Sequence, residues 1–456
     1  MKRWSAVLVV LALSGVEGLL AACGSPGPAP APSGAPTIIV ISLDGFPAYM
    51  FDDPRLPAPT LQRLIKEGAT AKGMTIVNPT VTWPNHTTLA TGVAPAKHGV
   101  LYNGLLTADP GKPAKVEQKN RDVLVKFPTV YDAAHKAGLT TAEVDWVPPQ
   151  TGGTITWSFE ENPDPNGAVE KEMVAAGLIT APELQDFKKG NPQWRDIMWT
   201  RAASHIVKAH RPNLLFFHLL NLDGTHHKYG PKTPAGLTAI SLVDARVAEL
   251  LAAVEEAGLK DRTTVIVVSD HGFKSAKRTI KPNAALVKAG FAKLEGTKVV
   301  SCSATVVPEG GTAMVYLRGT DAAEVGGKVR EALKALEGVD QVWEPAQYAA
   351  LGYPDPKLNP QMADFVLTAK TGYGFSGAAD GEPVVDVADG GYIGLHGYPA
   401  QDPDMNAIFI AWGRGIRKGA RIDTLRNVDV APTVAALLGL TLDGVDGAPV
   451  TAVLER

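Results

Sequence analysis

Cysteine is nearly absent from this 456-residue chain, which contains only Cys23 and Cys302. Two cysteines cannot form the disulfide framework that stabilises small secreted domains. If Cys23 carries a lipid, as its surroundings below indicate, no internal disulfide can form. The fold must then be stabilised by its hydrophobic core, and bound metal is the other available source of stability.

Runs of basic residues are also missing. The chain has 44 Lys and Arg against 47 Asp and Glu, a formal net charge of -3. Binding to a polyanion needs a concentrated positive field, so no nucleic-acid-binding surface is expected. The sequence leaves the oligomeric state open.

No apolar run of eighteen residues follows the N-terminal segment, so no later membrane-spanning helix is predicted. At the N-terminus, Lys2 and Arg3 precede an apolar stretch that ends in Ala21-Ala22-Cys23. This segment resembles a bacterial lipoprotein signal, in which Cys23 becomes a lipidated first residue. Gly24 stands where a retention aspartate would, so we expect export and an anchor at the periplasmic face of the outer membrane. The alternative is an ordinary secretory signal with an incidental cysteine.

Three apolar, β-branched runs predict strands buried on both faces, and each leads to an aspartate. Thr37 to Leu43 precedes Asp44, Leu214 to Leu222 precedes Asp223, and Thr263 to Ser269 precedes Asp270. Ligands of open α/β sheets gather at the carboxyl ends of the strands. The aspartates are therefore candidates for one site.

Helical patterns alternate with these runs and often end at glycine, as helix C-termini do. The alternation predicts an α/β fold with a doubly wound, mostly parallel sheet flanked by helices. The helices are expected over Pro59 to Gly68, Thr129 to Gly138, Met198 to Ala209, Thr238 to Ala257 and Asn283 to Gly290.

Two regions do not follow this alternation. Trp146 to Asn191 is rich in glycine, proline and polar residues, and is expected to be a surface excursion near the mouth of the site. The region from Lys298 to Asp389 has its own strand and helix patterns, and predicts a smaller inserted cap subdomain. The expected organisation is a signal peptide at 1–22, a proline-rich tether at 23–36, a catalytic core at 37–297 and 390–456, and the cap at 298–389.

Thr82 lies where an apolar run, Met74 to Val77, should give way to a helix over Asn85 to Thr91. Pro84 suits the first helical position, because its missing N–H would have no helical partner there. The helix start would offer free N–H groups and a favourable dipole to a phosphate beside Thr82. Taken alone, however, Thr82 is explained as a buried capping residue.

Six further side chains have the composition of a zinc site, because they are carboxylates and imidazoles without thiolates. A loop around residues 223–227 is expected to turn two of them toward one ion. Spacing favours His227 over the neighbouring His226 as the ligand. The six are Asp44, Asp223, His227, Asp270, His271 and the glycine-flanked His396.

The motifs around these residues resemble, in order, those of the nucleotide pyrophosphatase/phosphodiesterase family of the alkaline phosphatase superfamily. The resemblance covers residues 37 to about 440 and is weakest over 298–389. It rests on Ser42-Leu43-Asp44-Gly45-Phe46, Thr82-Trp83-Pro84-Asn85-His86, Asp223-x-x-x-His227, Ser269-Asp270-His271-Gly272 and His396-Gly397-Tyr398.

The resemblance implies an alkaline-phosphatase-like core and two Zn²⁺ ions per chain. It assigns Asp44, Thr82, Asp270 and His271 to the ion that activates Thr82 as nucleophile. The second ion, which receives substrate oxygen and activates water, would be held by Asp223, His227 and His396. Such a pair would allow in-line hydrolysis of a small-molecule phosphoester substrate, a phosphodiester, through a phospho-threonine.

The resemblance also implies substrate-binding residues. Asn103 matches the family asparagine that donates to a phosphoryl oxygen, although Asn103-Gly104 alone is a common turn signal. His218 occupies a position where nucleotide-hydrolysing relatives carry an aromatic residue that stacks on the base. Because a histidine stands there in this chain, the resemblance extends to phosphoester hydrolysis but not to nucleotide preference. Trp83, which follows the nucleophile, would keep one face of such a clamp.

Three other functions compete with phosphodiester hydrolysis. A phosphomonoesterase on the same scaffold would need added positive charge, which Glu143-Val144-Asp145-Trp146 does not offer. A sulfatase would need a modified cysteine or serine in place of Thr82. A non-catalytic surface lipoprotein that binds phosphorylated ligands would be expected to have lost a ligand, and none is lost.

Overall fold

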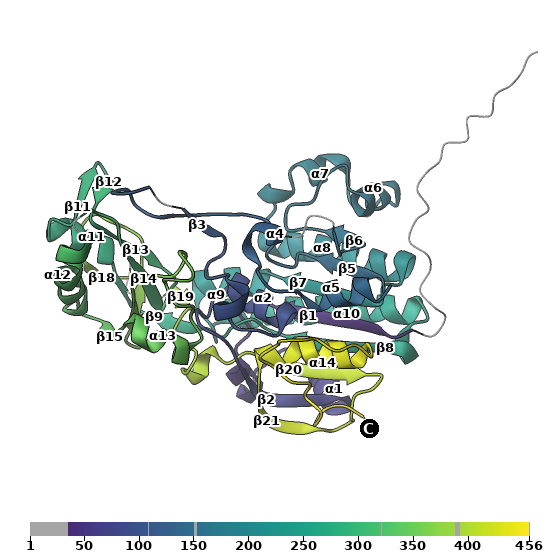
Figure 1. Ribbon diagram of the computed structural model, residues 1–456. Coiled ribbons are helices and arrows are strands. Elements are labelled where there is room, and N and C mark those ends of the chain that lie inside the picture. The colour runs from purple at the N-terminus through teal and green to yellow at the C-terminus, as the bar shows by residue number, and fades with distance from the viewer. Residues whose placement is uncertain (1–34, 108, 150–152, 321, 388–392, 456) are drawn as a thin grey trace, which may run out of the picture. The chain divides into compact units, whose positions relative to one another are not determined.

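An eight-stranded mixed sheet forms the centre of the computed structural model, which describes residues 35–107, 109–149, 153–320, 322–387 and 393–455 (Figure 1). The strand order is β21-β2-β20-β8-β1-β7-β5-β6, and β20 alone runs antiparallel to its two neighbours. The predicted doubly wound, mostly parallel sheet is confirmed. Its strands are β1 (Thr37–Leu43), β2 (Ala69–Thr75), β5 (Thr141–Val144), β6 (Trp157–Phe159), β7 (Leu214–Leu219), β8 (Thr263–Val268), β20 (Phe409–Gly413) and β21 (Arg421–Arg426).

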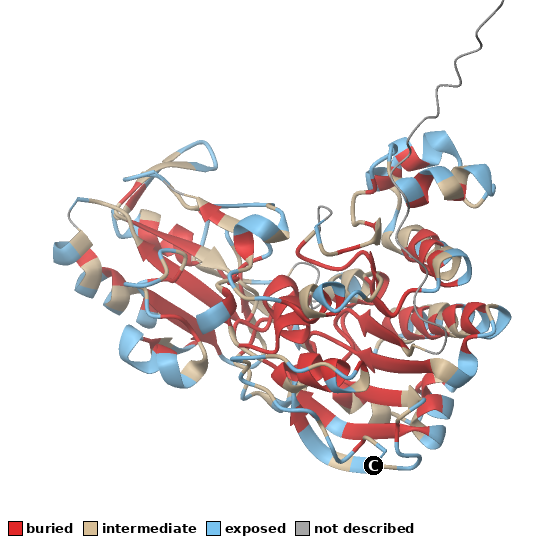
Figure 2. Ribbon diagram, turned by 45° about the vertical axis from the view of Figure 1, so that its right-hand side comes forward, coloured by how far each residue is buried: buried red, intermediate tan, exposed pale blue. Residues whose placement is uncertain are grey.

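Alternate residues of β1 pack into two different cores, as expected for a strand covered on both faces. Ile39 and Ile41 belong to the core built with α1, α8 and α10. Ile38 and Val40 belong to the core built with α2, α5 and α14. Figure 2 shows the strands of this sheet buried between helices whose outer sides are exposed. These helices are α1 (Pro59–Glu67), α8 (Pro192–His210), α10 (Pro234–Glu256), α2 (Thr82–Thr91), α5 (Val130–Lys136) and α14 (Val430–Leu437).

A second, four-stranded antiparallel sheet, in the order β13-β14-β16-β15, lies within the region predicted to be a cap. Smaller pairings begin before residue 298, because β10 pairs with β17 and β18, and β11 pairs with β12. The strands are β9 (Lys274–Ala276), β10 (Arg278–Ile280), β11 (Ala292–Glu295), β12 (Lys298–Cys302), β13 (Ala304–Pro308), β14 (Thr312–Leu317), β15 (Val339–Trp343), β16 (Phe365–Ala369), β17 (Tyr373–Phe375), β18 (Val384–Asp386) and β19 (Ile393–Leu395). The helices are α11 (Pro282–Lys288), α12 (Ala322–Lys334) and α13 (Pro345–Leu351).

The region from Trp146 to Asn191 is not a surface excursion throughout. It contributes β6, the edge strand of the central sheet, which pairs in parallel with β5. Trp146 is 2% exposed and packs edge-on against Phe216 of β7. The strand was not predicted because the region is rich in glycine and proline, and three residues are too few to show an alternation of apolar and polar side chains.

The remaining α-helices and β-strands of the described residues are short. They are α3 (Pro95–His98), α4 (Arg121–Leu124), α6 (Ala168–Ala175), α7 (Ala181–Gln185), α9 (Asn221–Tyr229) and the hairpin β3 (Leu105–Thr107) and β4 (Lys115–Glu117). Within the described ranges, no helix combines the length and hydropathy needed to cross a membrane. The expected signal peptide, most of the tether and Cys23 lie outside the described residues.

Candidate active site

Adjacent parallel strands bring the predicted ligands to one edge of the sheet. β8, β1 and β7 are neighbours in that order, so their carboxyl ends lie together. Asp44 directly follows β1, and Asp270 and His271 follow β8. All three side chains are fully buried. Topology rather than proximity in the chain therefore places Asp44 beside Asp270.

Asp223 and His227 lie on a helix, and the predicted loop at this position is wrong. Strand β7 ends at Leu219, and α9 begins at Asn221, so Asp223 is in the first helical turn. Residues four apart share one helix face. His227 Nε2 is accordingly 3.4 Å from Asp223 Oδ1. The neighbouring His226 points elsewhere, and its Nδ1 lies 3.2 Å from the carbonyl oxygen of Gly45.

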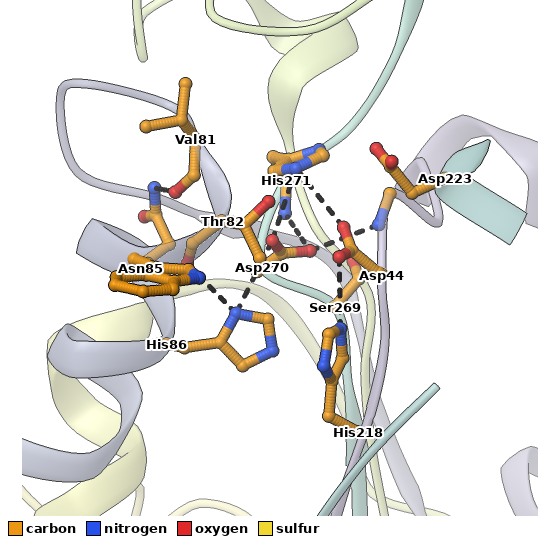
Figure 3. A network of polar contacts seen from close by, with 12 residues as sticks. Asp44, Val81, Thr82, Asn85, His86, His218, Asp223, Ser269, Asp270 and His271 are labelled. Carbon is orange, nitrogen blue, oxygen red and sulfur yellow. Dashed lines mark hydrogen bonds and ion pairs between the residues drawn. The ribbon is translucent and has the colours of Figure 1, made fainter. Parts of the chain in front are cut away.

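His396 reaches this edge through a strand pair outside the central sheet. β19 pairs with β9, which follows His271 closely in the chain. The His396 and His271 rings stack with centroids 3.7 Å apart. His396 Nε2 is 3.8 Å from Asp223 Oδ1. The six predicted ligands, although separated by up to 352 positions, thus lie in one cluster, part of which Figure 3 shows.

The cluster contains two triads that could each hold a metal ion, and they share His271. In each triad the ligand atoms lie within 4.8 Å of one another. One triad is Asp44, Asp270 and His271, and the other is Asp223, His271 and His396.

The unpaired atoms of these residues fit a bound cation. Asp44 Oδ1, Asp223 Oδ1, Asp270 Oδ2 and His271 Nε2 are buried and have no hydrogen-bond partner among the described residues. Buried polar atoms are normally satisfied, because leaving one unpaired costs about 1–3 kcal/mol. Metal ions would satisfy all four at once.

The second ring nitrogen of each candidate histidine is engaged by the backbone. His227 Nδ1 is 3.0 Å from the Gly394 carbonyl, His271 Nδ1 is 3.1 Å from that of Gly272, and His396 Nδ1 is 2.9 Å from that of Thr80. A carbonyl only accepts, so each Nδ1 carries the hydrogen in these contacts. In the neutral ring, Nε2 then offers a lone pair, which is the arrangement usual for metal ligands.

The pKa shifts reflect the crowding of carboxylates in a buried space. Burial, with the charge of Asp223, raises the pKa of Asp44 to about 6. Burial and Asp44 raise the pKa of Asp270 well above its usual value. Burial, with the neighbouring His227, lowers the pKa of His396 to about 4. The cluster therefore crowds carboxylates beside the neutral imidazoles of His271 and His396. Burial opposes protonation of His227, but the charge of Asp223 outweighs it and raises the pKa of His227 to about 9, so this ring must lose a proton to bind a cation.

Thr82 is the first residue of α2 and is 8% exposed. Figure 3 shows its side chain beside His271 and Asp270. Pro84 occupies the third position of the helix, and the prediction that it occupies the first is wrong. The first four N–H groups of a helix have no intrahelical partner, so proline is tolerated at both positions. The helix begins at Thr82, so the Thr82 hydroxyl lies beside the helix N-terminus.

Asn103 is tied to the same helix start. Its Oδ1 accepts the Trp83 N–H at 2.9 Å, and the residue is exposed. This contact satisfies one of the free N–H groups of α2. It also leaves the side-chain NH₂ of Asn103 to donate outward.

The structure buries both His218 and Trp83, so the predicted substrate-binding role of His218 and the predicted stacking face of Trp83 are wrong. His218 is 2% exposed and lies between two carboxylates, with Nε2 3.0 Å from Asp44 Oδ2 and Nδ1 3.1 Å from Asp145 Oδ2. Trp83 is 4% exposed and packs with Val100 and apolar neighbours in a separate cluster. A stacking residue needs an accessible ring face, and neither ring has one.

Sequence reasoning did not assign site roles to two buried residues. His86, one helical turn after Thr82, contacts the Thr82 carbonyl at 2.9 Å and lies 3.5 Å from Asp270 Oδ2. Asp145 has a left-handed φ of 55°, which is strained for a residue with a Cβ. The four-residue spacing from Thr82 could have indicated His86, whereas no sequence signal indicates Asp145.

Replacing His218 tests its place between the two carboxylates. His218→Phe should lower the free energy of unfolding of metal-free protein by about 3 kcal/mol at pH 7, since it leaves Asp44 and Asp145 buried without their shared partner. Urea unfolding measures the free energy of unfolding, and His135→Phe, at an exposed histidine, is the control. Adding Asp145→Asn should recover part of the loss, and an unchanged midpoint for His218→Phe would contradict the argument.

The family model described as "Type I phosphodiesterase / nucleotide pyrophosphatase" matches residues 38–399. The chain belongs to this family. Human ectonucleotide pyrophosphatase/phosphodiesterase family member 7 is 26% identical over 447 residues, which cover 98% of this chain and 88% of that protein. The bis(5'-adenosyl)-triphosphatase enpp4 of Xenopus laevis is 26% identical over 91% of this chain and 80% of its own length. Family member 1 of Mus musculus is 24% identical, and the chain spans 42% of that protein's length.

Solved structures of the phosphodiesterase/nucleotide pyrophosphatase family share the fold. Murine ectonucleotide pyrophosphatase/phosphodiesterase 5 superposes with a TM-score of 0.69 at 20% identity, over 92% of this chain and 100% of that one. Another structure of the murine protein is an inactive threonine-to-alanine variant in complex with AMP. At this identity, the superposition establishes the fold.

Proposed function

We propose that this protein hydrolyses phosphodiester bonds, including nucleotide pyrophosphate bonds, through a phospho-threonine intermediate on Thr82. The observation that carries the proposal is the convergence of four buried, unpaired ligand atoms beside Thr82 at the start of α2. The family to which the chain belongs supports the reaction class. The AMP complex of the murine relative, formed with an inactive threonine variant, supports both a nucleotide substrate and a threonine nucleophile.

We further propose two Zn²⁺ ions as cofactors. Asp44, Thr82, Asp270 and His271 would hold one ion, and Asp223, His227 and His396 would hold the other. Zinc at these positions would lower the pKa of the Thr82 hydroxyl and offset charge on the phosphoryl oxygens. The carboxylate and imidazole donors and the Nε2 tautomers described above suit this ion.

The residues of the chain then have defined tasks. Thr82 Oγ1 attacks phosphorus, and the bond from phosphorus to the leaving alcohol breaks as the threonine phosphoester forms. The Asn103 NH₂ donates to a non-bridging oxygen, while its Oδ1 stays fixed on the Trp83 N–H. Water attacks the phosphoester in the second step, which releases a phosphate monoester and restores the Thr82 hydroxyl.

Diesters are favoured over monoesters because the site offers little positive charge for a dianionic phosphoryl group. Within the described ranges, every ion pair of the six ligand residues joins an aspartate to a histidine, and none involves Lys or Arg. An aryl phosphodiester should therefore be cleaved at least about tenfold faster than the corresponding monoester.

Parallel rate measurements on the two aryl esters test both proposals. Chelator should abolish diester cleavage, and added Zn²⁺ should restore it. Faster monoester cleavage would indicate that the protein is a phosphomonoesterase. Absence of cleavage of either ester by zinc-loaded, folded protein would favour a non-catalytic, ligand-binding role.

We also propose, from the sequence, that the protein is exported and anchored to a bacterial membrane by a lipid on Cys23. Cys23→Ser should move the protein from the membrane fraction to the soluble fraction in cell fractionation. An unchanged membrane fraction would contradict the anchor.

A further inference from the structure

A group of potential ligands lies outside the candidate active site, at the end of α8. His205 and His210 are on the last turns of α8, and Glu172 is on α6. Both imidazole Nε2 atoms converge on one carboxylate oxygen, Glu172 Oε2, at 2.8 Å and 2.7 Å. Their ligand atoms all lie within 4.8 Å of one another. Nothing in the proposed hydrolysis uses these residues.

The two histidines are held in place rather than free in solvent. Their side chains are 17% and 13% exposed, and Glu172 is 37% exposed. The His210 ring stacks on Trp157 of β6, with centroids 3.5 Å apart and planes at 14°. The packing orients both Nε2 atoms before any ligand arrives, which reduces the entropy lost on binding.

We propose that Glu172, His205 and His210 bind a third Zn²⁺ ion, separate from the candidate active site. Two imidazoles and one carboxylate form a common zinc ligand set, and the exposed side of Glu172 leaves the fourth position to water. Tetrahedral zinc separates its ligand atoms by about 3.3 Å, given bonds of about 2.0–2.1 Å to each. The observed contacts need to open by only about 0.5 Å to admit the ion.

The site is distinct from the catalytic cluster in position and in role. Asp196, near the start of α8, accepts the Leu220 N–H at the start of α9, which carries Asp223. His205 follows nine residues later, about 14 Å along the helix axis. Zinc there would join α6 to the end of α8 and, through Trp157, to the edge strand of the sheet. The ion is therefore expected to stabilise the fold without taking part in hydrolysis.

Zinc stoichiometry tests the proposal on the full chain. After equilibration with buffered Zn²⁺ and removal of excess, His205→Gln and Glu172→Gln should each contain one zinc per chain fewer than the wild type, measured by plasma mass spectrometry. His135→Gln, which alters an exposed histidine on α5, should match the wild type. All four proteins keep the catalytic ligands, so the difference does not depend on the proposed function. Equal zinc content in folded wild type and His205→Gln would overturn the proposal.

A second measurement needs no variant and remains decisive if a substitution disturbs folding. Diethyl pyrocarbonate modifies accessible imidazoles, and mass spectrometry locates the modified residues. In wild-type protein, Zn²⁺ should protect His205 and His210 and leave His135 reactive. Unchanged modification of His205 and His210 with zinc present would overturn the proposal.

Discussion

Thr82→Ala should lower kcat/KM for an aryl phosphodiester at least about 1,000-fold, because it removes the atom that attacks phosphorus. The Thr82 side chain is small and 8% exposed at the first position of α2, so alanine fits there without a clash. Val81, not Thr82, is the N-cap residue, so no capping bond is lost. The thermal midpoint should therefore change little while activity is lost.

Two further substitutions make the Thr82 result specific. Thr82→Ser keeps a hydroxyl and should retain activity well above that of Thr82→Ala. Thr238→Ala, on the exposed side of α10, should match the wild type. Rapid quenching with a labelled diester should trap phosphate on wild-type protein and none on Thr82→Ala. Full activity in folded Thr82→Ala would refute the mechanism.

Among substitutions in the cluster, Asp270→Asn should impair metal binding with the least disturbance of the fold. Asp270 Oδ1 accepts the N–H groups of Gly45 and His271 at 3.1 Å and 3.0 Å, and an asparagine oxygen can keep both. Its Oδ2 is buried without a hydrogen-bond partner. The amide would therefore preserve the local backbone while removing the charge that zinc requires.

Asp270→Asn should leave the thermal midpoint of the metal-free protein unchanged or higher, and should lower the activity and stability of the zinc-loaded protein. Burial and the nearby Asp44 raise the Asp270 pKa, so the folded metal-free state favours the neutral group. A raised pKa means that stability is present at low pH and is lost as pH rises toward the folded-state value. At pH 7 the neutral amide should thus leave the metal-free thermal midpoint equal to or above that of the wild type.

In the zinc-loaded protein, Asp270→Asn should lose at least about 100-fold in kcat/KM and most of the thermal stabilisation by zinc. Calorimetric titration and thermal unfolding with and without zinc measure both effects. The exposed Asp261→Asn is the matched control. Wild-type zinc affinity in Asp270→Asn would show that Asp270 is not a ligand.

The strands that carry the site were predictable because their apolar runs leave few alternatives. Thr37 to Leu43 is buried along its whole length and forms β1 with the predicted ends. Asp44 and Asp270 follow such runs, so their place at the carboxyl edge of the sheet follows from the parallel fold. The helix of Asp223 was missed because Leu220 and Leu222, on either side of Asn221, extend the apolar pattern past the end of β7.

The roles of His218 and Trp83 depended on contacts between distant parts of the chain. His218 is the fifth residue of β7, and the prediction placed its ring toward substrate. The fold instead places it between Asp44 and Asp145, which the chain separates from it by 174 and 73 positions. Neither carboxylate is a sequence neighbour, so periodicity and motif spacing had no means of indicating the contact.

The sequence by itself determined the sheet, the threonine at the start of a helix and the identity of six candidate ligands. These features depend on local hydrophobic patterns and on short motifs, which act over a few residues. Only the tertiary structure decided which ligands share His271, that His218 lies buried beside Asp44, and that Glu172 meets His205 and His210. Those contacts join separate elements, and their geometry arises from how the elements pack, which no single segment encodes.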